Sequence, residues 1–565
     1  MIRRTFAYAT LILLLACLAL YWNPQVLSTP LPASGSKAAA EKKQIKIVVI
    51  PLDSRPPCGQ FLVQLAPLAG CKIILPPKSI LDAYQRPADI AALRAWLLGE
   101  APTADAAIIS IDMLEHGGLW ASRNPRPDSR EAFSRAVDLL RQIHAANPRL
   151  KIHVFSIIPR QIIADNPAYI GFQPAMLQYS TLWDLAATFE NPADITRLNK
   201  TAQNLPPELL TFYDALFASS LKTNRALIRL VEENVLASLI IGQDDSGPYG
   251  IPNIIKDRLE QEIANKPYLA HKVFITHGAD EVALAIMSRI AVRASGARIR
   301  IFPYYSEPGA AYRILPFMPV TLGAAVRDKV RLVGAELASN PKDADILLFV
   351  HAGTSQTSRL SLENAASRLR SLVEKNKNKY VALVDLTEDF YAHETLLPAL
   401  LRQGFHPFQL AAYAGWNTAG NSIGTAVAHS ALLAALSARP APDSEAPGIL
   451  KASLEFLAAR YLDDWNYLKE IQPEVDGRLR SLGIQPNNIG YWHEKTSRLI
   501  ARTIEDRAHS FFTLYLAEDP VSIWTPWKTK EILVKSLSVK AALPWPRTFE
   551  AELKTHLNIE VIDQN

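Results

Sequence analysis

Two adjacent carboxylates, Asp244 and Asp245, stand directly after an apolar run that begins at Leu239. An apolar run of this length, bounded by turn residues, is typical of a buried parallel strand. The carboxyl ends of such strands are where α/β proteins hold their catalytic groups. Neighbouring carboxyl groups couple, so that one keeps its proton while the other is ionised. Glycosidases use such an acid and base, and we expect Asp244 and Asp245 to form a catalytic pair.

The direction of the two side chains decides whether this pair can work together. Adjacent residues of an extended strand point to opposite faces, so both acids face one cavity only if the chain has already turned. The following Gly247-Pro248 favours such a turn, and Gln243 and Tyr249 then become candidates for substrate binding, since a tyrosine ring can stack on a sugar. Adjacent acids are also similar to those of retaining hexosaminidases, where one carboxylate orients the substrate's acetamido group and the other protonates the leaving oxygen. In the alternative interpretation the two acids form an Asx-turn or a helix cap.

Polar residues follow other strand-like runs as well. Asp53 and Arg55 come after the first run, where they could hold hydroxyls or an anionic group, or pair with each other to shape the loop. Asp112 ends the third run, and His116 and Arg123 lie in the loop that follows. Because the carboxyl ends of parallel strands converge in space, we expect these five residues to bind substrate near the acid pair.

Two later loops complete the predicted site. His277 and Asp280 precede a predicted helix, and N-capping or the helix dipole alone would explain one of the acids Asp280 and Glu281. The small-residue turn 415–421 carries an aromatic ring with amide and hydroxyl groups, a set that suits sugar binding and equally suits a tight loop. Its candidate residues are Trp416, Asn417, Thr418 and Asn421. The turn lacks the Gly-x-Gly-x-x-Gly spacing and the chain has no Walker motif, so we expect no cofactor.

A divalent metal ion is the main alternative chemistry. His116, His277 and His351 all follow strand-like runs, and aspartates lie near them in the predicted topology. Such a set could hold a metal ion. No compact His-x-x-x-His or His-x-Asp spacing supports it, and we assign no metal ligand.

The cysteines do not indicate a disulfide. Cys58 and Cys71 flank a predicted helix over residues 59–69. Opposite ends of such a helix are roughly 15–20 Å apart, beyond disulfide reach. We expect both thiols to be unpaired.

The elements that must position these loops alternate between strands and helices. Helix-period segments, for example 130–145, 221–236, 280–294 and 362–375, separate many of the strand-like runs. The predicted strands are 45–52, 71–75, 106–111, 152–158, 238–241, 272–275, 299–302, 345–350, 380–384 and 408–412. This alternation predicts a parallel α/β architecture in two units. The first unit covers residues 46–270 and is barrel-like or doubly wound, the second covers 271–440 and is doubly wound, and 441–565 form a helical and β-rich C-terminal region.

The amino terminus resembles a targeting segment. Arg3 and Arg4 precede an uncharged run up to Trp22, and Leu14–Cys17 resembles a bacterial lipobox. We expect residues 1–22 to be a cleaved signal, an uncleaved membrane anchor or a leader lipidated at Cys17, followed by a flexible linker over residues 23–45. The arginines would stay in the cytoplasm, so the body would be extracytoplasmic, either membrane-anchored or secreted.

The net charge of +5 resides in the amino-terminal tail. Residues 1–46 hold six of the 60 basic residues and one of the 55 acidic residues, so the remaining chain is neutral, with 54 of each. A nucleic-acid-binding body would carry a net positive charge, and we therefore exclude nucleic acid as a partner.

Several segments together resemble an uncharacterised bacterial family, domain of unknown function 4127. The resemblance spans most of residues 46–440 and is carried by the order of the motifs. These are Ile50-Pro-Leu-Asp-Ser-Arg-Pro56, Ser110-Ile-Asp-Met-Leu114, Gly117-Gly-Leu-Trp-Ala-Ser-Arg123, Gly242-Gln-Asp-Asp245, Gly278-Ala-Asp-Glu281 and Ala414-Gly-Trp-Asn-Thr-Ala-Gly-Asn421. The resemblance implies kinship without chemistry, because the family carries no assigned function.

The residues themselves point to a membrane-tethered extracytoplasmic hydrolase of the α/β class that acts on a carbohydrate or an amino-sugar polymer of the cell envelope. Asp244 and Asp245 would supply the acid and the base. Two alternatives stay open. One is a two-lobed protein that binds a sugar or envelope fragment without reaction, and the other is a metal-dependent hydrolase.

Overall fold

In the computed structural model of the protein, six parallel strands form a first open sheet in the order β2-β1-β3-β4-β5-β6. Their bounds are β1 Ile45–Ile50, β2 Cys71–Ile74, β3 Ala106–Ser110, β4 Lys151–Ile158, β5 Ser238–Gln243 and β6 Val273–His277. The strands are aliphatic runs, as expected for a parallel sheet covered by helices on both faces. The open order is doubly wound, so the barrel alternative for this unit is wrong.

The structure describes residues 44–124, 129–164, 168–439, 445–517 and 519–562. The predicted leader 1–22 and the predicted linker, up to residue 43, lie outside these ranges. Residues from Ile45 onward form one compact unit. Within the described ranges, no helix is long and apolar enough to cross a membrane.

Five parallel strands form a second sheet, in the order β11-β10-β9-β7-β8. Their bounds are β7 Arg300–Tyr305, β8 Glu336–Leu337, β9 Ile346–Gly353, β10 Tyr380–Thr387 and β11 Ala412–Ala414. Counted along the chain, this order is 2-1-3-4-5, and the first five strands of the first sheet follow it too. Two expectations need correction. The first sheet extends past residue 270, because β6 pairs with β5; and Pro407–Gln409 is a 3-10 turn, so the last strand starts at Ala412.

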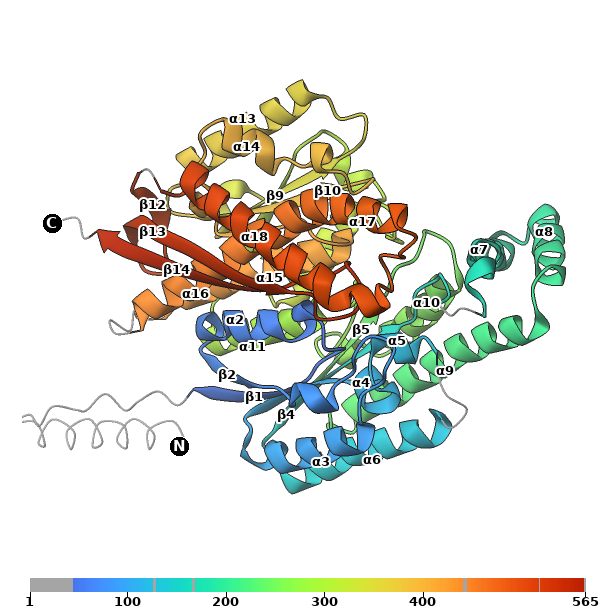
Figure 1. Ribbon diagram of the computed structural model, residues 1–565. Helices are drawn as coiled ribbons and strands as arrows, with labels where there is room; N and C mark the ends of the chain where they lie inside the picture. The colour runs from blue at the N-terminus through green and yellow to red at the C-terminus, as the bar shows by residue number, and fades with distance from the viewer. Residues whose placement is uncertain (1–43, 125–128, 165–167, 440–444, 518, 563–565) are drawn as a thin grey trace, which may run out of the picture. The chain divides into compact units, whose positions relative to one another are not determined.

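Helices cover both faces of each sheet. Their bounds are α2 Gln60–Ala69, α3 Ile90–Glu100, α4 Ile111–His116, α5 Leu119–Ser122, α6 Ser129–Ala146, α7 Gln173–Phe189, α8 Pro192–Gln203, α9 Pro207–Glu232, α10 Ile251–Ala264, α11 Val282–Ser295, α12 Leu322–Leu332, α13 Arg359–Lys375, α14 Leu397–Arg402 and α15 Ala419–Ser437. Figure 1 shows α3 and α6 beside one face of the first sheet and α2 and α11 beside the other. Successive strand residues alternate between these faces, so Ile47 and Val49 join one core while Val48 and Ile50 join another.

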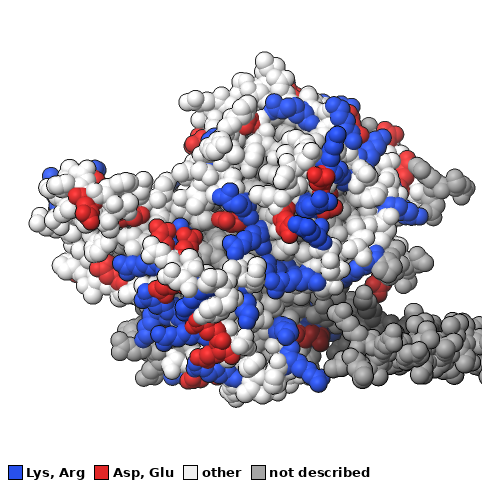
Figure 2. Space-filling model, turned by 180° about the vertical axis from the view of Figure 1, so that it is seen from behind, with Lys and Arg blue, Asp and Glu red and all other residues white. Residues whose placement is uncertain are grey.

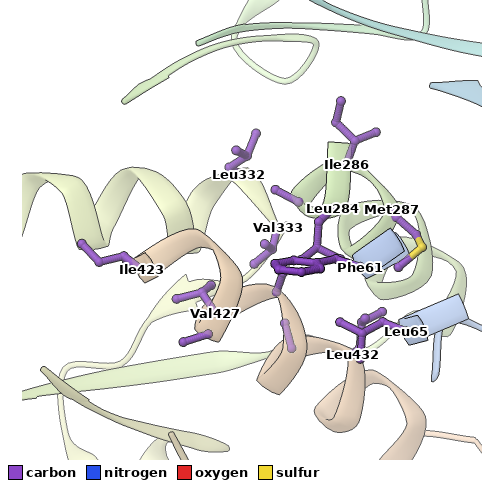
Figure 3. Packing of buried hydrophobic residues seen from close by; sticks show 14 of the residues in the cluster. Phe61, Leu65, Leu284, Ile286, Met287, Leu332, Val333, Ile423, Val427 and Leu432 are labelled. Carbon is purple, nitrogen blue, oxygen red and sulfur yellow. The ribbon is translucent and has the colours of Figure 1, made fainter. Parts of the chain in front are cut away.

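One layer of helices is shared by the two parallel sheets. Its core combines Ile47 of the first sheet with Leu348 of the second and with side chains of α2, α11, α12 and α15. Figure 3 shows Phe61 of α2 among Leu284 of α11, Val333 and Val427 of α15. Helix α15 is buried along nearly its whole length, which its small and apolar residues allow. The loops at the carboxyl ends of both sheets are therefore held by a common core.

The C-terminal region packs on the outer face of the second sheet. Helix α16 (Ala446–Arg460) continues through a π-helix, Tyr461–Ile471, into α17 (Gln472–Ser481), and α18 (His493–Tyr515) follows. The antiparallel strands β12 (Val521–Trp524), β13 (Thr529–Ala542) and β14 (Glu552–Ile562) form a third sheet. The predicted helical and β-rich character of this region is confirmed. Long π-helices are rare and are often found at functional sites.

Surface charge and cysteines agree with the sequence patterns. Cys58 and Cys71 are buried and free, on either side of α2. The face shown in Figure 2 carries Lys and Arg interspersed with Asp and Glu.

Candidate functional site

A cavity of about 550 Å³ lies where the carboxyl ends of both parallel sheets meet the C-terminal region. The loops after β1, β3, β4, β5 and β6 line it from the first sheet, and those after β7, β10 and β11 from the second. Ligands of open α/β sheets bind at this end of the strands. Ten of the fifteen predicted site residues line it: Asp53, Arg55, Arg123, Asp244, Asp245, Asp280, Trp416, Asn417, Thr418 and Asn421.

The acid pair sits where β5 has just ended. The Asp244 amide donates to the Ile158 carbonyl at 3.2 Å, and the Asp245 carbonyl accepts from the Gln161 amide at 2.9 Å, so the loop after β4 holds the turn. Arg123 donates to Asp244 Oδ2 through Nε at 3.0 Å and also through Nη2. Both acids line the cavity, as the predicted turn requires.

Asp245 differs from its neighbour in that its carboxylate has no partner among the described residues. Its carboxylate is half-buried, and among the described residues it makes no hydrogen bond or ion pair. Burial raises the pKa of Asp245 to about 7, and the Asp244 charge adds to the effect. Burial also opposes ionisation of Asp244, but the Arg123 and Arg160 charges outweigh it and lower the pKa of Asp244 below its usual value. Near neutral pH the pair therefore holds one protonated and one ionised carboxyl group.

Arg55 joins two aspartates that lie on neighbouring parts of the cavity wall. Its Nη2 donates to Asp53 Oδ2 at 2.7 Å and to Asp280 Oδ1 at 2.6 Å, and its guanidinium lies 5.4 Å from the Trp545 ring centroid. Burial and the Asp53 charge raise the pKa of Asp280 to about 6, although Arg55 opposes the shift. Asp280 does not cap α11, and Glu281 instead pairs with the buried Lys329. Glu281 occupies the N-cap position of α11, but neither acid makes a side-chain capping hydrogen bond to this helix.

Hydrogen bonds to residues outside the cavity lining hold the turn after β11. The Gly415 amide donates to Asp464 Oδ2 at 2.8 Å, and Asn421 Oδ1 accepts from the Ala279 amide at 3.2 Å. Trp416 packs its ring edge against Phe61 at 5.9 Å between centroids, and it is buried in the core rather than presented as a sugar platform. Only one edge of the turn reaches the cavity, through residues 416–418 and 421.

Three predicted residues of the first sheet lie outside the cavity lining. Asp112 is buried behind it, where its Oδ2 accepts from the Ile157 amide at 3.0 Å. Burial lowers the pKa of His116 to about 4, so this ring is neutral at pH 7. The Gln243 amide nitrogen donates to Ser246 and Asn253, because Gln243 is the last strand residue and alternation turns it away from Asp244.

Two further predicted residues also lie outside the cavity lining. Tyr249 is 39% exposed and packs its ring against Phe189 at 5.9 Å. His277 is buried, with Nδ1 3.5 Å from Asp328. Neither lines the cavity, so the structure does not place them where they could bind substrate with the acid pair.

The cavity also contains groups that the sequence patterns did not indicate. They come from the loop after β4 and from the C-terminal region, and they are Arg160, Asp463, Lys469, Trp545, Arg547, Phe549 and Glu550. Arg547 donates to Glu550 at 2.7 Å and lies over the Trp545 ring at 4.8 Å. Arg160 follows a strand-like run, so the strand-end pattern could have found it. The others lie far beyond the acid pair in the sequence, without a local signal.

Three non-glycine residues with strained backbone conformations line the cavity. Phe317, Phe390 and Asn417 all have positive φ angles, of 62°, 64° and 46°, and all three line it. The two phenylalanine rings lie 6.2 Å apart. Non-glycine residues in this conformation persist only where the surroundings impose it, and they cluster at functional sites.

The predicted histidine metal set does not assemble. His351 is buried and bonds Ser306 and the Glu394 carbonyl, at 3.0 and 2.8 Å. A different group, Asp53, Cys58 and Asp280, places its donor atoms within 4.8 Å of one another. Arg55 donates to both of these carboxylates and balances their charge, so this group fits a cation poorly.

Comparisons with known proteins place the residues of this cavity within a family, but they assign no reaction to it. A family model described as "Protein of unknown function (DUF4127)" matches residues 47–554, which include every loop of the cavity. The curated proteins contain no match to the chain.

Proposed function

Since the chain belongs to the DUF4127 family, whose description assigns no activity, we propose from the cavity alone that the protein hydrolyses glycosides. Asp245 acts as the general acid and Asp244 as its ionised partner. The observation that supports this proposal is the contrast between the two adjacent acids: Arg123 binds one of them, and the other faces the cavity without a protein partner.

The protonation states of Asp244 and Asp245 suit cleavage of a glycosidic bond. A carboxyl group with a pKa of about 7, such as Asp245, keeps its proton at mildly acidic pH and can give it to a leaving oxygen. Because the Asp245 carboxyl group has no hydrogen-bonding partner among the described residues, a substrate oxygen can take that position.

Asp244 is placed to orient rather than to attack. Its Oδ2 accepts both hydrogen bonds of Arg123, and its Oδ1 accepts from the Asp245 amide at 2.9 Å. A carboxylate held in this way is a weak nucleophile, but it retains lone pairs that can accept an N–H. We therefore favour an amino-sugar substrate, whose acetamido nitrogen donates to Asp244.

In this mechanism the substrate's acetamido oxygen attacks the anomeric carbon while the Asp245 proton moves to the leaving oxygen. The glycosidic bond breaks, and an oxazolinium ring forms on the sugar. Water then adds to the anomeric carbon, gives its proton to Asp245 and reopens the ring. Asp244 stabilises the positive charge that develops on the acetamido nitrogen.

The cavity walls suit a sugar. The lining contains paired charges together with the aromatic rings of Trp120, Phe317, Phe390, Trp545 and Phe549. Aromatic faces bind the apolar face of a sugar ring, while fixed carboxylates and guanidinium groups bind its hydroxyls. The proposal includes an extracytoplasmic location and an envelope glycan as substrate, which rest on the leader-like residues 1–22.

The test is turnover of para-nitrophenyl N-acetyl-β-glucosaminide and of cell-wall glycan by the full chain. We expect Asp245→Asn to lower kcat by about 100-fold or more, since general acid catalysis contributes that much. Asp506→Asn is the matched control, because Asp506 is exposed on α18. If the wild type releases no product from any amino-sugar glycoside, the proposed reaction is wrong.

A sugar-binding protein without catalysis is the second candidate. The pairing of Asp244 with Arg123, and of Asp53 and Asp280 with Arg55, favours it, because paired charges bind hydroxyls without reacting. A ligand that raises the melting temperature without forming product would support this candidate. Elemental analysis of protein purified without chelator tests the metal-dependent alternative in the same preparation.

A further inference from the structure

Lys469 is a buried cation on the cavity wall. It lies on the π-helix Tyr461–Ile471, lines the cavity, and is 6% exposed. Burial of an ammonium group costs free energy unless other groups replace its water. The groups that Lys469 contacts therefore indicate which kind of ligand the cavity binds.

The contacts of Lys469 leave its charge without a counter-ion. Its Nζ donates to Thr387 Oγ1 at 2.9 Å and lies 5.1 Å from the Phe390 ring centroid. Within the part of the chain that the structure describes, no carboxylate oxygen pairs with this Nζ. By contrast, Arg123 and Arg547, on the same cavity, are paired with Asp244 and Glu550.

The carboxylates on the neighbouring elements are held by other donors. Asp385 accepts from the Leu396 and Leu397 amides, at 2.7 and 3.0 Å. Asp464 pairs with Arg460 at 2.6 Å, and Glu394 Oε2 accepts from the Asp389 amide at 3.1 Å, while its buried Oε1 has no hydrogen bond among the described residues. These groups moderate the cost of burying Lys469, but none of them contacts it directly. Burial still lowers the pKa of Lys469 to about 8, so it is mostly charged at neutral pH.

We propose that Lys469 binds the carboxylate of an acidic sugar, so that the cavity takes an amino sugar or uronic acid that carries a carboxyl group. The inference deepens the proposed function, on which only the sugar part rests. One end of the ligand meets the Asp245 carboxyl group, and the negative end meets Lys469, which no carboxylate pairs among the described residues. The strained backbone at Phe390 places an aromatic ring beside this cation.

A carboxylate fits this position better than a phosphate. One lysine and one threonine hydroxyl supply a single charge and few donors. A phosphate monoester carries about −1.5 to −2 charges and is usually bound by several cationic or backbone donors. Three other cations of the cavity, Arg55, Arg123 and Arg547, are already neutralised by carboxylates.

The experiment compares matched sugars by calorimetric titration and by thermal shift. The probes are N-acetylmuramic acid, its methyl ester, glucuronic acid, N-acetylglucosamine and a phosphorylated N-acetylglucosamine. The proteins are the full-length wild type, Lys469→Met, Lys469→Arg and the exposed control Lys495→Met. Asp245→Asn is added to separate binding from turnover.

We expect the wild type, Lys495→Met and Asp245→Asn to bind an acidic sugar about tenfold more tightly than its neutral counterpart, as one charge-assisted contact would give. Lys469→Met should lose this preference while it still binds the neutral sugar, and Lys469→Arg should keep part of it. The inference is overturned if the wild type does not prefer the acid, if Lys469→Met keeps the preference, or if the phosphorylated sugar binds best. A preference for the acid without any hydrolysis would support the inference while rejecting the proposed reaction.

Discussion

Arg123, in the loop after β3, holds Asp244 at the end of β5 through two hydrogen bonds to one carboxylate oxygen, with Nε at 3.0 Å. The two residues lie 121 positions apart in the sequence, and the parallel sheet brings them together. This pair keeps Asp244 ionised beside an acid that keeps its proton. The different roles assigned to Asp244 and Asp245 therefore depend on Arg123.

Removal of the Arg123 charge should disturb both acids. In Arg123→Met the pKa of Asp244 should rise, because burial is then opposed by fewer charges, and the two acids would compete for one proton. We expect kcat on an amino-sugar glycoside to fall by about 100-fold, with partial activity in Arg123→Lys. Arg141→Met, at an exposed pair with Glu233, is the control. Wild-type activity in Arg123→Met would show that Asp244 needs no partner.

The pH dependence of activity should follow the protonation of Asp245. Because its pKa is about 7 and the acid must be protonated, kcat/KM should fall by about tenfold per pH unit above about pH 7. Asp244 must be ionised, and its lowered pKa places the loss of activity on the acid side below the range in which an ordinary aspartate takes up a proton. A pH–rate profile checks both limbs. A profile that keeps rising to about pH 9 would assign the proton transfer to another group.

The ion network around Arg55 should be essential for stability. Arg55→Met would leave Asp53 and Asp280 buried without a cation, and loss of one partner from a buried pair costs about 3–5 kcal/mol. Urea unfolding measures the change. The matched control Arg298→Met breaks an exposed pair with Glu336 and should cost less than about 1 kcal/mol. Equal effects of the two substitutions would mean that water already screens the Arg55 network.

A close backbone approach should make Gly420 hard to replace. A Cβ at Gly420 would lie 2.6 Å from the His277 carbonyl oxygen, so Gly420→Ala should push the turn after β11 away from the loop after β6. Gly448, in the first turn of α16, has open space within 4 Å of the place that a Cβ would take, and Gly448→Ala should stabilise the helix by up to about 1 kcal/mol. Opposite signs in thermal unfolding are expected. A stabilising Gly420→Ala would show that the two loops are not held together.

Strands were easier to predict from the sequence than their arrangement. Nearly every aliphatic run ending in a polar cluster formed a parallel strand, because burial on both faces requires such a run. The assignment of β6 to the second unit failed, since strand–helix alternation looks the same on both sides of residue 270. Which strands become neighbours depends on packing between distant segments, here the shared helices α11 and α15.

Strand geometry also explains which of the predicted site residues line the cavity. Residues just beyond a strand, such as Asp53 and Asp244, reached the cavity, because parallel strands end at one edge of the sheet. Gln243, one position earlier, is turned away by the alternation of the strand. Lys469 and Glu550 could not be found, since only the return of the C-terminal region to both sheets brings them to the cavity.

The helices between the two parallel sheets belong to neither sheet alone. Each sheet uses α2, α11, α12 and α15 as the cover for one of its faces, so separation of the sheets would expose that apolar face to water. The chain from Ile45 onward therefore cannot be cut into two soluble halves at the point where one sheet ends and the next begins. Cutting there would yield aggregating fragments, because each would expose the apolar surface that the shared helices cover in the intact protein.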